Sequence, residues 1–215
     1  MKSNSDGLMI DGILGYIDRD NIDTDQIIPT EYLKSIKKFG FEDYLFDGWR
    51  YHDDGRLGVK KEEREINEDF ILNKAPFNES KILLARDNFG CGSSREHAVW
   101  ALRDFGIKAV IASSFGDIFY NNCFKNGVLP IQLQKNQIEE LFQTIKDEVL
   151  ELSVDLQKRI ITIGDKELSF DVEDHLIDRI IYGLDDVDIT LKSKDKIFNF
   201  EKYRKETRPW IFINE

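Results

Sequence analysis

The chain has 215 residues, 41% of them hydrophobic, which suits one compact domain with a sizeable core. Its 41 acidic residues outnumber its 30 basic ones, so a net charge of −11 disfavours binding to a nucleic-acid phosphate backbone. No run of about 18 apolar residues occurs, which disfavours a membrane-spanning helix.

Taken in chain order, apolar runs predict strands and periodic apolar positions predict helices. Short apolar runs predict strands at 8–17, 81–85, 108–112, 128–133, 148–154, 159–163 and 167–172. Apolar residues spaced three and four apart predict helices over 94–105, 115–125, 136–147 and 173–182.

The order of these elements predicts an α/β fold. Strands and helices alternate from 81 to 133 with short connections, which is typical of a parallel central sheet with right-handed crossovers. The runs near 150–170 predict a smaller antiparallel sheet, with a turn at Gly164 and Asp165. We expect one domain over 1–215.

Two segments lack this regularity. Residues 39–79 are charged, aromatic and poorly periodic, so we expect an inserted loop region, and long loops in compact domains are often functional. Residues 192–215 form a charged C-terminal tail that ends in the apolar RPWIFI run, which either packs on the domain or meets a partner.

Polar chemistry gathers where strand 81–85 gives way to the next helix. Gly90 and Gly92 allow a sharp turn, and the free N–H groups of a helix start attract an anion. Arg95 adds a planar fork suited to a carboxylate. The turn therefore predicts a binding site for a small acidic molecule, with Ser93 and Ser94 beside it.

A purely structural alternative exists for part of this turn. The sequence SSRE fits a capping box, in which Ser93 caps the helix and Glu96 reaches back. His97 and Cys91 are expected to be packing residues. The segment lacks the third glycine of a dinucleotide fingerprint, the lysine of a P-loop and the G-x-S-x-G spacing of a hydrolase elbow.

Three stretches carry a family resemblance: GSSREHA at 92–98, NIDTDQIIPTEYLK at 21–34 and GFEDYLFDGWRY at 40–51. Over roughly residues 10–190 the chain closely resembles the small subunits of 3-isopropylmalate dehydratase, in their bacterial long form. GSSREHA is specific to the aconitase superfamily, whose mobile swivel domain is the counterpart of these subunits. Residues 52–66 form a longer insertion than in bacterial relatives.

The resemblance implies a fold and a reaction. The fold is a swivelling three-layer β/β/α domain. The reaction removes water from 2-isopropylmalate and adds it back to give 3-isopropylmalate, a step of leucine biosynthesis. Related hydro-lyases that act on citraconate, maleate or homoaconitate share the motifs, so they are the alternative.

By resemblance, Ser93 is the catalytic base, acting as an alkoxide. A serine oxygen ionises only where N–H groups and a helix start stabilise the anion, and Gly90, Cys91 and Gly92 would form that backbone cradle. Ser94 and Arg95 would bind the substrate carboxylate.

The 21–34 motif supplies the other implied site residues. Thr24 and Asp25 would line the site, with Asp25 orienting a histidine of the partner. Lys34 would meet the second carboxylate or recognise the isopropyl group, unless it is simply solvated. Without the resemblance, the motif is an acidic turn with Asp20 or Asp23 as a helix cap.

The implied cofactor is a [4Fe–4S] cluster on a separate large subunit, with which this chain would form a heterodimer. The chain has two cysteines, whereas such a cluster takes about four ligands, so we expect no metal site here. Two cysteines and the lack of a signal-peptide core in the first twelve residues favour a cytoplasmic protein.

Two other function classes remain as alternatives. A regulatory RNA-binding relative is disfavoured by the acidic charge. A stand-alone carboxylate-binding module would bind its ligand tightly without a partner.

Overall fold

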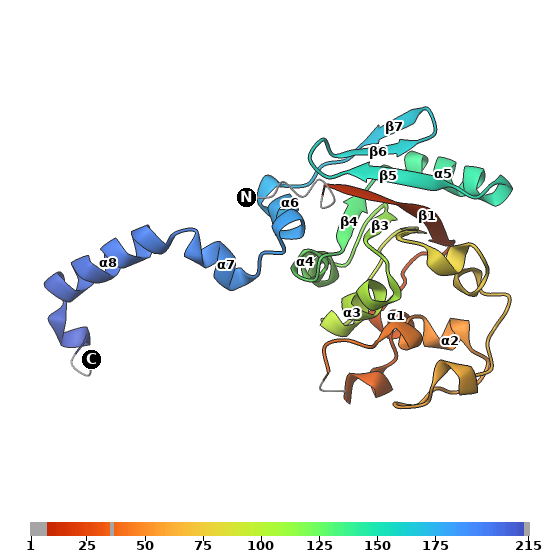
Figure 1. Cartoon of the computed structure of the whole chain (residues 1–215), viewed down its shortest axis with the longest axis horizontal. Helices are drawn as coiled ribbons and strands as arrows, with labels where there is room; N and C mark the ends of the chain where they lie inside the picture. The colour runs from red at the N-terminus through yellow and green to blue at the C-terminus, as the bar shows by residue number, and fades with distance from the viewer. Residues whose placement is uncertain (1–7, 35–36, 213–215) are drawn as a thin grey trace. The chain divides into compact units, whose positions relative to one another are not determined.

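The computed structural model describes residues 8–34 and 37–212 (Figure 1). Its contacts group into two units, a body that ends at Tyr182 and a C-terminal unit that begins at Gly183. No helix of the described residues is long and apolar enough to cross a membrane.

One seven-stranded sheet forms the centre of the body. Its strands are β1 (Met9–Ile17), β2 (Ile82–Ala85), β3 (Ala109–Ala112), β4 (Leu129–Gln132), β5 (Glu151–Asp155), β6 (Ile160–Ile163) and β7 (Lys166–Ser169). They lie in the order β4-β3-β2-β1-β5-β6-β7. The first four are parallel and the last three antiparallel, so the predicted parallel core and antiparallel meander are both confirmed.

Strand β1 joins the two halves of the sheet. Its second half pairs in parallel with β2, as at Leu14 and Ile82, while its first half pairs antiparallel with β5. The two sheets expected from the sequence are therefore parts of one continuous sheet.

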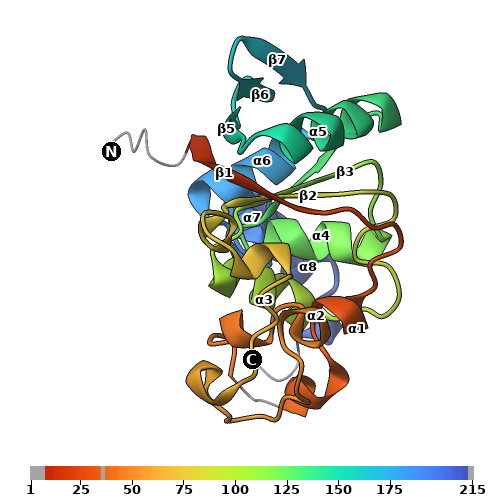
Figure 2. The ribbon, with the colours of Figure 1, turned by 90° about the vertical axis from the view of Figure 1, so that its right-hand side faces the viewer.

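Helices cover both faces of the sheet. The predicted ones are confirmed as α3 (Glu96–Phe105), α4 (Asp117–Lys125), α5 (Lys135–Asp147) and α6 (Asp174–Tyr182). Figure 2 shows α5 on one side of the sheet and α3 on the other, with the short α1 (Thr24–Ile27) and α2 (Asp47–Arg50). Strands β2 and β3 are buried along their whole length because both faces are covered.

The segment 39–79 has little regular structure but is well packed. Its short helices are η3 (Glu42–Tyr44), α2, η4 (Lys61–Glu63), η5 (Ile71–Asn73) and η6 (Phe77–Glu79). Phe41, Leu45, Phe46 and Leu72 join the core on the α3 side of the sheet, each at most 1% exposed. Buried apolar side chains therefore anchor this region.

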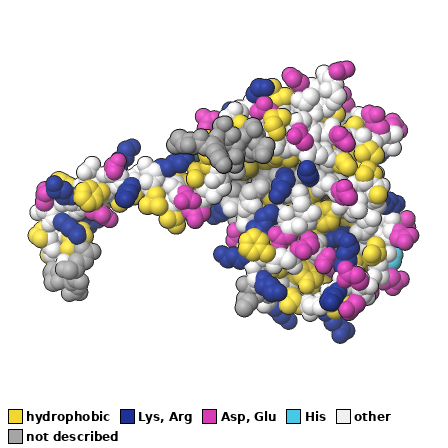
Figure 3. Space-filling model, in the orientation of Figure 1, with side chains coloured by type: hydrophobic (Ala, Val, Ile, Leu, Met, Phe, Trp, Pro, Cys, Tyr) yellow, Lys and Arg dark blue, Asp and Glu magenta, His cyan; other side chains and the backbone are white. Residues whose placement is uncertain are grey.

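The C-terminal unit consists of α7 (Asp186–Leu191), α8 (Lys194–Thr207) and η7 (Pro209–Ile211). None of its described side chains is buried. Phe198, Phe200, Tyr203 and Trp210 are all exposed, and hydrophobic side chains stand on the surface of this unit in Figure 3.

Polar contacts at the carboxyl ends of β2 and β3 fix the start of the glycine-rich loop. Asp87 accepts hydrogen bonds from Ser113 (3.2 Å), Ser114 (2.5 Å) and Lys135 (2.9 Å). These bonds, above all the one from Ser114, lower the pKa of the Asp87 carboxyl to about 2. These hydrogen bonds therefore fix the position of Asp87, from which the glycine-rich loop continues.

Gly90 marks the place where this loop passes closest to α4. Its φ is +72°, and a Cβ atom there would lie 2.2 Å from the Cγ atom of Phe119. Gly92 also has a positive φ, +89°, but its Cβ would meet nothing nearer than 3.5 Å. At position 90, both the positive φ and the nearby ring of Phe119 therefore require a glycine. At position 92, only the positive φ does.

The two glycines give a matched pair of variants. We expect Gly90→Ala to lower the free energy of unfolding by about 3 kcal/mol or more, since overlap with Phe119 adds to left-handed strain. Gly92→Ala should cost only about 1 kcal/mol, the strain alone. Urea unfolding of both variants measures the difference, and equal losses would contradict the close packing described here.

Candidate active site

Two backbone hydrogen bonds bring the two sequence motifs side by side. Gly90 N donates to Ile22 O (2.7 Å), and Thr24 N donates to Cys91 O (3.0 Å). They form a short parallel bridge between Asp23 and Cys91. Asp23 also caps α1 by accepting from Gln26 N (2.8 Å), as the acidic-turn interpretation predicted.

The predicted capping box at Ser93 and Glu96 is wrong. Helix α3 begins at Glu96, and its N-cap is Arg95, without a side-chain cap. A tight turn, in which Arg95 N donates to Ser93 O (2.8 Å), keeps Ser93 outside the helix. Glu96 instead accepts a hydrogen bond from Asn126 (2.9 Å), so the Ser93 hydroxyl is not committed to a cap.

The turn before α3 exposes unpaired backbone donors. Ser93 and Ser94 are exposed, and within residues 8–34 and 37–212 no hydrogen bond uses the N–H of Gly92, Ser93 or Ser94. The N–H of Gly90, by contrast, is already bonded to Ile22. Consecutive free N–H groups beside a helix start form a concavity that attracts anions.

Arg95 and Asp25, predicted from separate motifs, form an ion pair. Arg95 Nη1 contacts Asp25 Oδ1, and the two side chains are 20% and 50% exposed. Thr30 completes a triangle, because its hydroxyl donates to Asp25 Oδ1 (2.6 Å) and accepts from Arg95 Nη1 (3.1 Å). The Thr30 hydrogen bond and then Arg95 lower the pKa of Asp25, which keeps this carboxylate ionised.

The triangle leaves one side of each charged group open. Among the described contacts, Arg95 uses only Nη1, and Asp25 uses only Oδ1. The Nε–Nη2 edge of Arg95 has the geometry that binds a carboxylate through two parallel hydrogen bonds.

Thr24 and Lys34, which the sequence also predicted as site residues, are not part of the triangle of Asp25, Thr30 and Arg95. Thr24 is 1% exposed, and its hydroxyl donates to Ser93 O (3.2 Å), so it stabilises the turn from the buried side. Lys34 ends η2 (Thr30–Lys34) and is exposed, and no contact in the described part of the chain joins it to Ser93 or Arg95.

Neither cysteine is poised as a metal ligand. Cys123 is fully buried, and burial raises the pKa of both thiols. No group of three or more potential metal ligands occurs among the described residues. The expectation that His97 is a packing residue is confirmed, since its ring lies 5.5 Å from that of Phe41 and 4.4 Å from that of Trp100.

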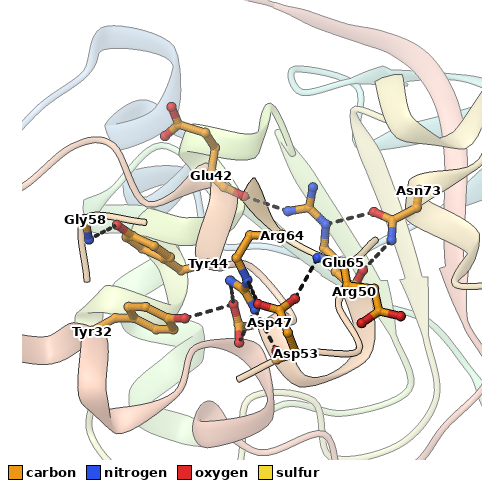
Figure 4. A network of polar contacts seen from close by, with 10 residues as sticks. All are labelled: Tyr32, Glu42, Tyr44, Asp47, Arg50, Asp53, Gly58, Arg64, Glu65 and Asn73. Carbon is orange, nitrogen blue, oxygen red and sulfur yellow. Dashed lines mark hydrogen bonds and ion pairs between the residues drawn. The ribbon is translucent and has the colours of Figure 1, made fainter. Parts of the chain in front are cut away.

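A buried ionic network, which the sequence did not reveal, anchors η2 (Figure 4). Tyr32 donates to Asp47 Oδ1 (2.9 Å), and Arg64 Nη1 lies 2.7 Å from the same oxygen. Arg64 also bonds Asp53 Oδ2 through Nε (2.7 Å) and lies 4.0 Å above the ring of Tyr51. The 51–66 segment is thereby tied to the short helix that carries Thr30 and Lys34.

Two family models of known proteins match parts of this chain. The family model of the aconitase C-terminal domain matches residues 8–136. A second model, which describes the C-terminal domain of 3-isopropylmalate dehydratase small subunits, matches residues 186–214.

Individual relatives match almost the whole chain. The 3-isopropylmalate dehydratase small subunit of Marinobacter nauticus is 49% identical over 203 residues and covers 94% of each chain. That of Hahella chejuensis is 48% identical over 206 residues, 95% of this chain and 96% of its own. A crystal structure of 3-isopropylmalate dehydratase from Methanocaldococcus jannaschii superposes with a TM-score of 0.61 at 29% identity, covering 91% of this chain and 99% of that one. The chain therefore belongs to the family of 3-isopropylmalate dehydratase small subunits, within the aconitase superfamily.

Proposed function

We propose that this chain is the small subunit of a cytoplasmic 3-isopropylmalate dehydratase, which interconverts 2-isopropylmalate and 3-isopropylmalate in leucine biosynthesis. The observation that carries the proposal is the exposed Ser93 turn with open N–H groups, beside an arginine that has a free carboxylate-binding edge. A dicarboxylic acid needs both features, an anchor for a carboxylate and a base near the neighbouring carbon.

Ser93 is the proposed base. Its Oγ, as an alkoxide, would take the proton from the carbon next to a carboxylate. The hydroxyl group on the adjacent carbon would leave as hydroxide to the Lewis acid that the large subunit's cluster would supply. The re-addition of water would reverse these steps at exchanged positions. The open N–H groups of the turn and the start of α3 would stabilise the anionic oxygen. Gly90 and Cys91 shape this cradle, and Gly92 also contributes a donor.

Arg95 and Ser94 are the proposed carboxylate binders. The open Nε–Nη2 edge of Arg95 would grip a substrate carboxylate while Nη1 stays on Asp25. The open Oδ2 of Asp25 would orient a histidine of the partner, and Lys34 would approach the distal end of the substrate. Thr24 would act indirectly, by holding the Ser93 carbonyl.

The [4Fe–4S] cluster does not fit this chain and is proposed to belong to the large subunit. The chain has two cysteines, one of them fully buried, whereas a cluster takes about four thiolate ligands. The proposed active enzyme is thus a heterodimer, in which this chain supplies part of the active site. The body of this chain would swivel against the large subunit.

Co-expression with the large subunit, followed by anaerobic assay, tests the function and the base together. We expect turnover of isopropylmalate and little of citraconate or homocitrate. Ser93→Ala should lower kcat by about a thousandfold or more while the heterodimer still assembles. Ser153→Ala, a serine on β5, is the matched control and should keep wild-type activity. Turnover of citraconate or homocitrate in place of isopropylmalate would refute the assigned substrate, and an active Ser93→Ala enzyme would refute the base.

Arg95→Lys tests the carboxylate fork. A lysine offers a point charge in place of two parallel donors, so KM for isopropylmalate should rise by about tenfold or more. Arg103→Lys is the control, since Arg103 lies on α3, the helix that Arg95 precedes, is equally exposed (20%) and binds Asp104 instead. Equal effects of the two substitutions on KM would count against the role of Arg95.

A further inference from the structure

We propose that Thr30 is a positioning residue, which holds Asp25 and Arg95 in the one relative geometry that binds the substrate. The inference rests on the proposed function and assigns a role to a residue of the 21–34 motif for which the sequence predicted none. It starts from the triangle in which a single hydroxyl contacts both charged groups.

A threonine hydroxyl suits this place because it is donor and acceptor at once. Its one proton goes to Asp25 Oδ1 (2.6 Å), and a lone pair accepts from Arg95 Nη1 (3.1 Å). The three contacts of the triangle therefore join three atoms, Thr30 Oγ1, Asp25 Oδ1 and Arg95 Nη1. The Nε–Nη2 edge of Arg95 and the Oδ2 atom of Asp25 take no part in the triangle.

Without a third contact, the ion pair would be poorly defined. Its side chains are 20% and 50% exposed, and exposed ion pairs gain little free energy from holding one geometry. Thr30 supplies the third point that fixes both side chains. Valine in its place would keep the shape of the side chain and lose both hydrogen bonds.

The backbone of Thr30 is itself held firmly. Tyr32, two residues later in the same short helix, is completely buried and donates to Asp47. The Asp47 and Arg64 side chains that complete this anchor are only 7% and 3% exposed (Figure 4). The backbone that carries the Thr30 hydroxyl is therefore fixed relative to the ion pair.

The charge state of Asp25 offers a readout that packing alone would not move. The hydrogen bond from Thr30 is the largest cause of the lowered pKa of Asp25, ahead of Arg95, the charged group that faces it from the loop before α3. On its own element, the Asp23 carboxylate is occupied as the cap of α1. Loss of the Thr30 hydroxyl should therefore raise the pKa of Asp25 toward that of an ordinary aspartate.

The test compares Thr30→Val with Thr30→Ser, which keeps the hydroxyl. In the isolated chain, carboxyl NMR titration should show a raised pKa for Asp25 in Thr30→Val and a wild-type pKa in Thr30→Ser. In the reconstituted enzyme, Thr30→Val should raise KM about fivefold, with a smaller change in kcat, and Thr30→Ser should restore it. Thr144→Val removes a hydroxyl that donates to a helix carbonyl and should change neither.

Two results would contradict the role of Thr30, and a third would contradict the proposed function. An unchanged titration of Asp25 in Thr30→Val would overturn the inference, as would a Thr30→Ser enzyme as impaired as Thr30→Val. If Thr30→Val fails to fold, Thr30→Ala takes its place with the same expectations. Failure of the wild-type heterodimer to turn over isopropylmalate would instead refute the proposed function, and the titration would still decide the role of Thr30.

Discussion

The candidate site depends on a short parallel bridge between two loops. Gly90 N donates to Ile22 O and Thr24 N to Cys91 O, and these two bonds place the 21–30 segment against the turn before α3. The hydroxyl of Thr24 adds a third bond, to the carbonyl of Ser93. Arg95 can reach Asp25 and Thr30 because the backbones are already joined there. If the bridge opened, only side-chain contacts would hold Ser93 near Asp25.

The bridge also explains why the glycine-rich loop has its sequence. The Gly90 N–H is bonded to Ile22 O, and the ring of Phe119 leaves no space for a side chain at Gly90. The backbone then turns so that the next free N–H groups, at 92–94, lie at the surface next to Ser93 and Ser94. One constraint on packing thus produces both the close approach and the exposed donors.

Much of the fold could be predicted from the sequence because apolar periodicity reports directly on burial. Strands β2 and β3 are continuous apolar runs covered on both faces, the first three residues of β4 are also buried, and α5 carries a regular apolar stripe. The S-x-x-E pattern misled because it is local, whereas the start of α3 is set by the turn from Arg95 N to Ser93 O. The four residues of a capping-box motif do not show that a tighter turn, between Ser93 and Arg95, forms before the helix begins.

The parts that escaped prediction depend on pairing across irregular backbone. Arg64 meets Asp47 and Asp53 at separations of 17 and 11 residues, with no period to mark them. Thr30 was overlooked because a threonine after a proline carries no signal of its own, and its role exists only once Asp25 and Arg95 are brought together. The resemblance predicted which residues belong to the site, and the structure adds the contacts that hold them.

The bridge can be measured through the hydrogen exchange of two backbone amides in the isolated chain. We predict that the amides of Gly90 and Thr24 exchange as slowly as those in the middle of β2, because they close the contact on which the site depends. The amides of Ser93 and Ser94 should exchange rapidly. Rapid exchange at Gly90 and Thr24, as fast as at Ser93, would show that the two loops are not joined and would contradict this account of the site.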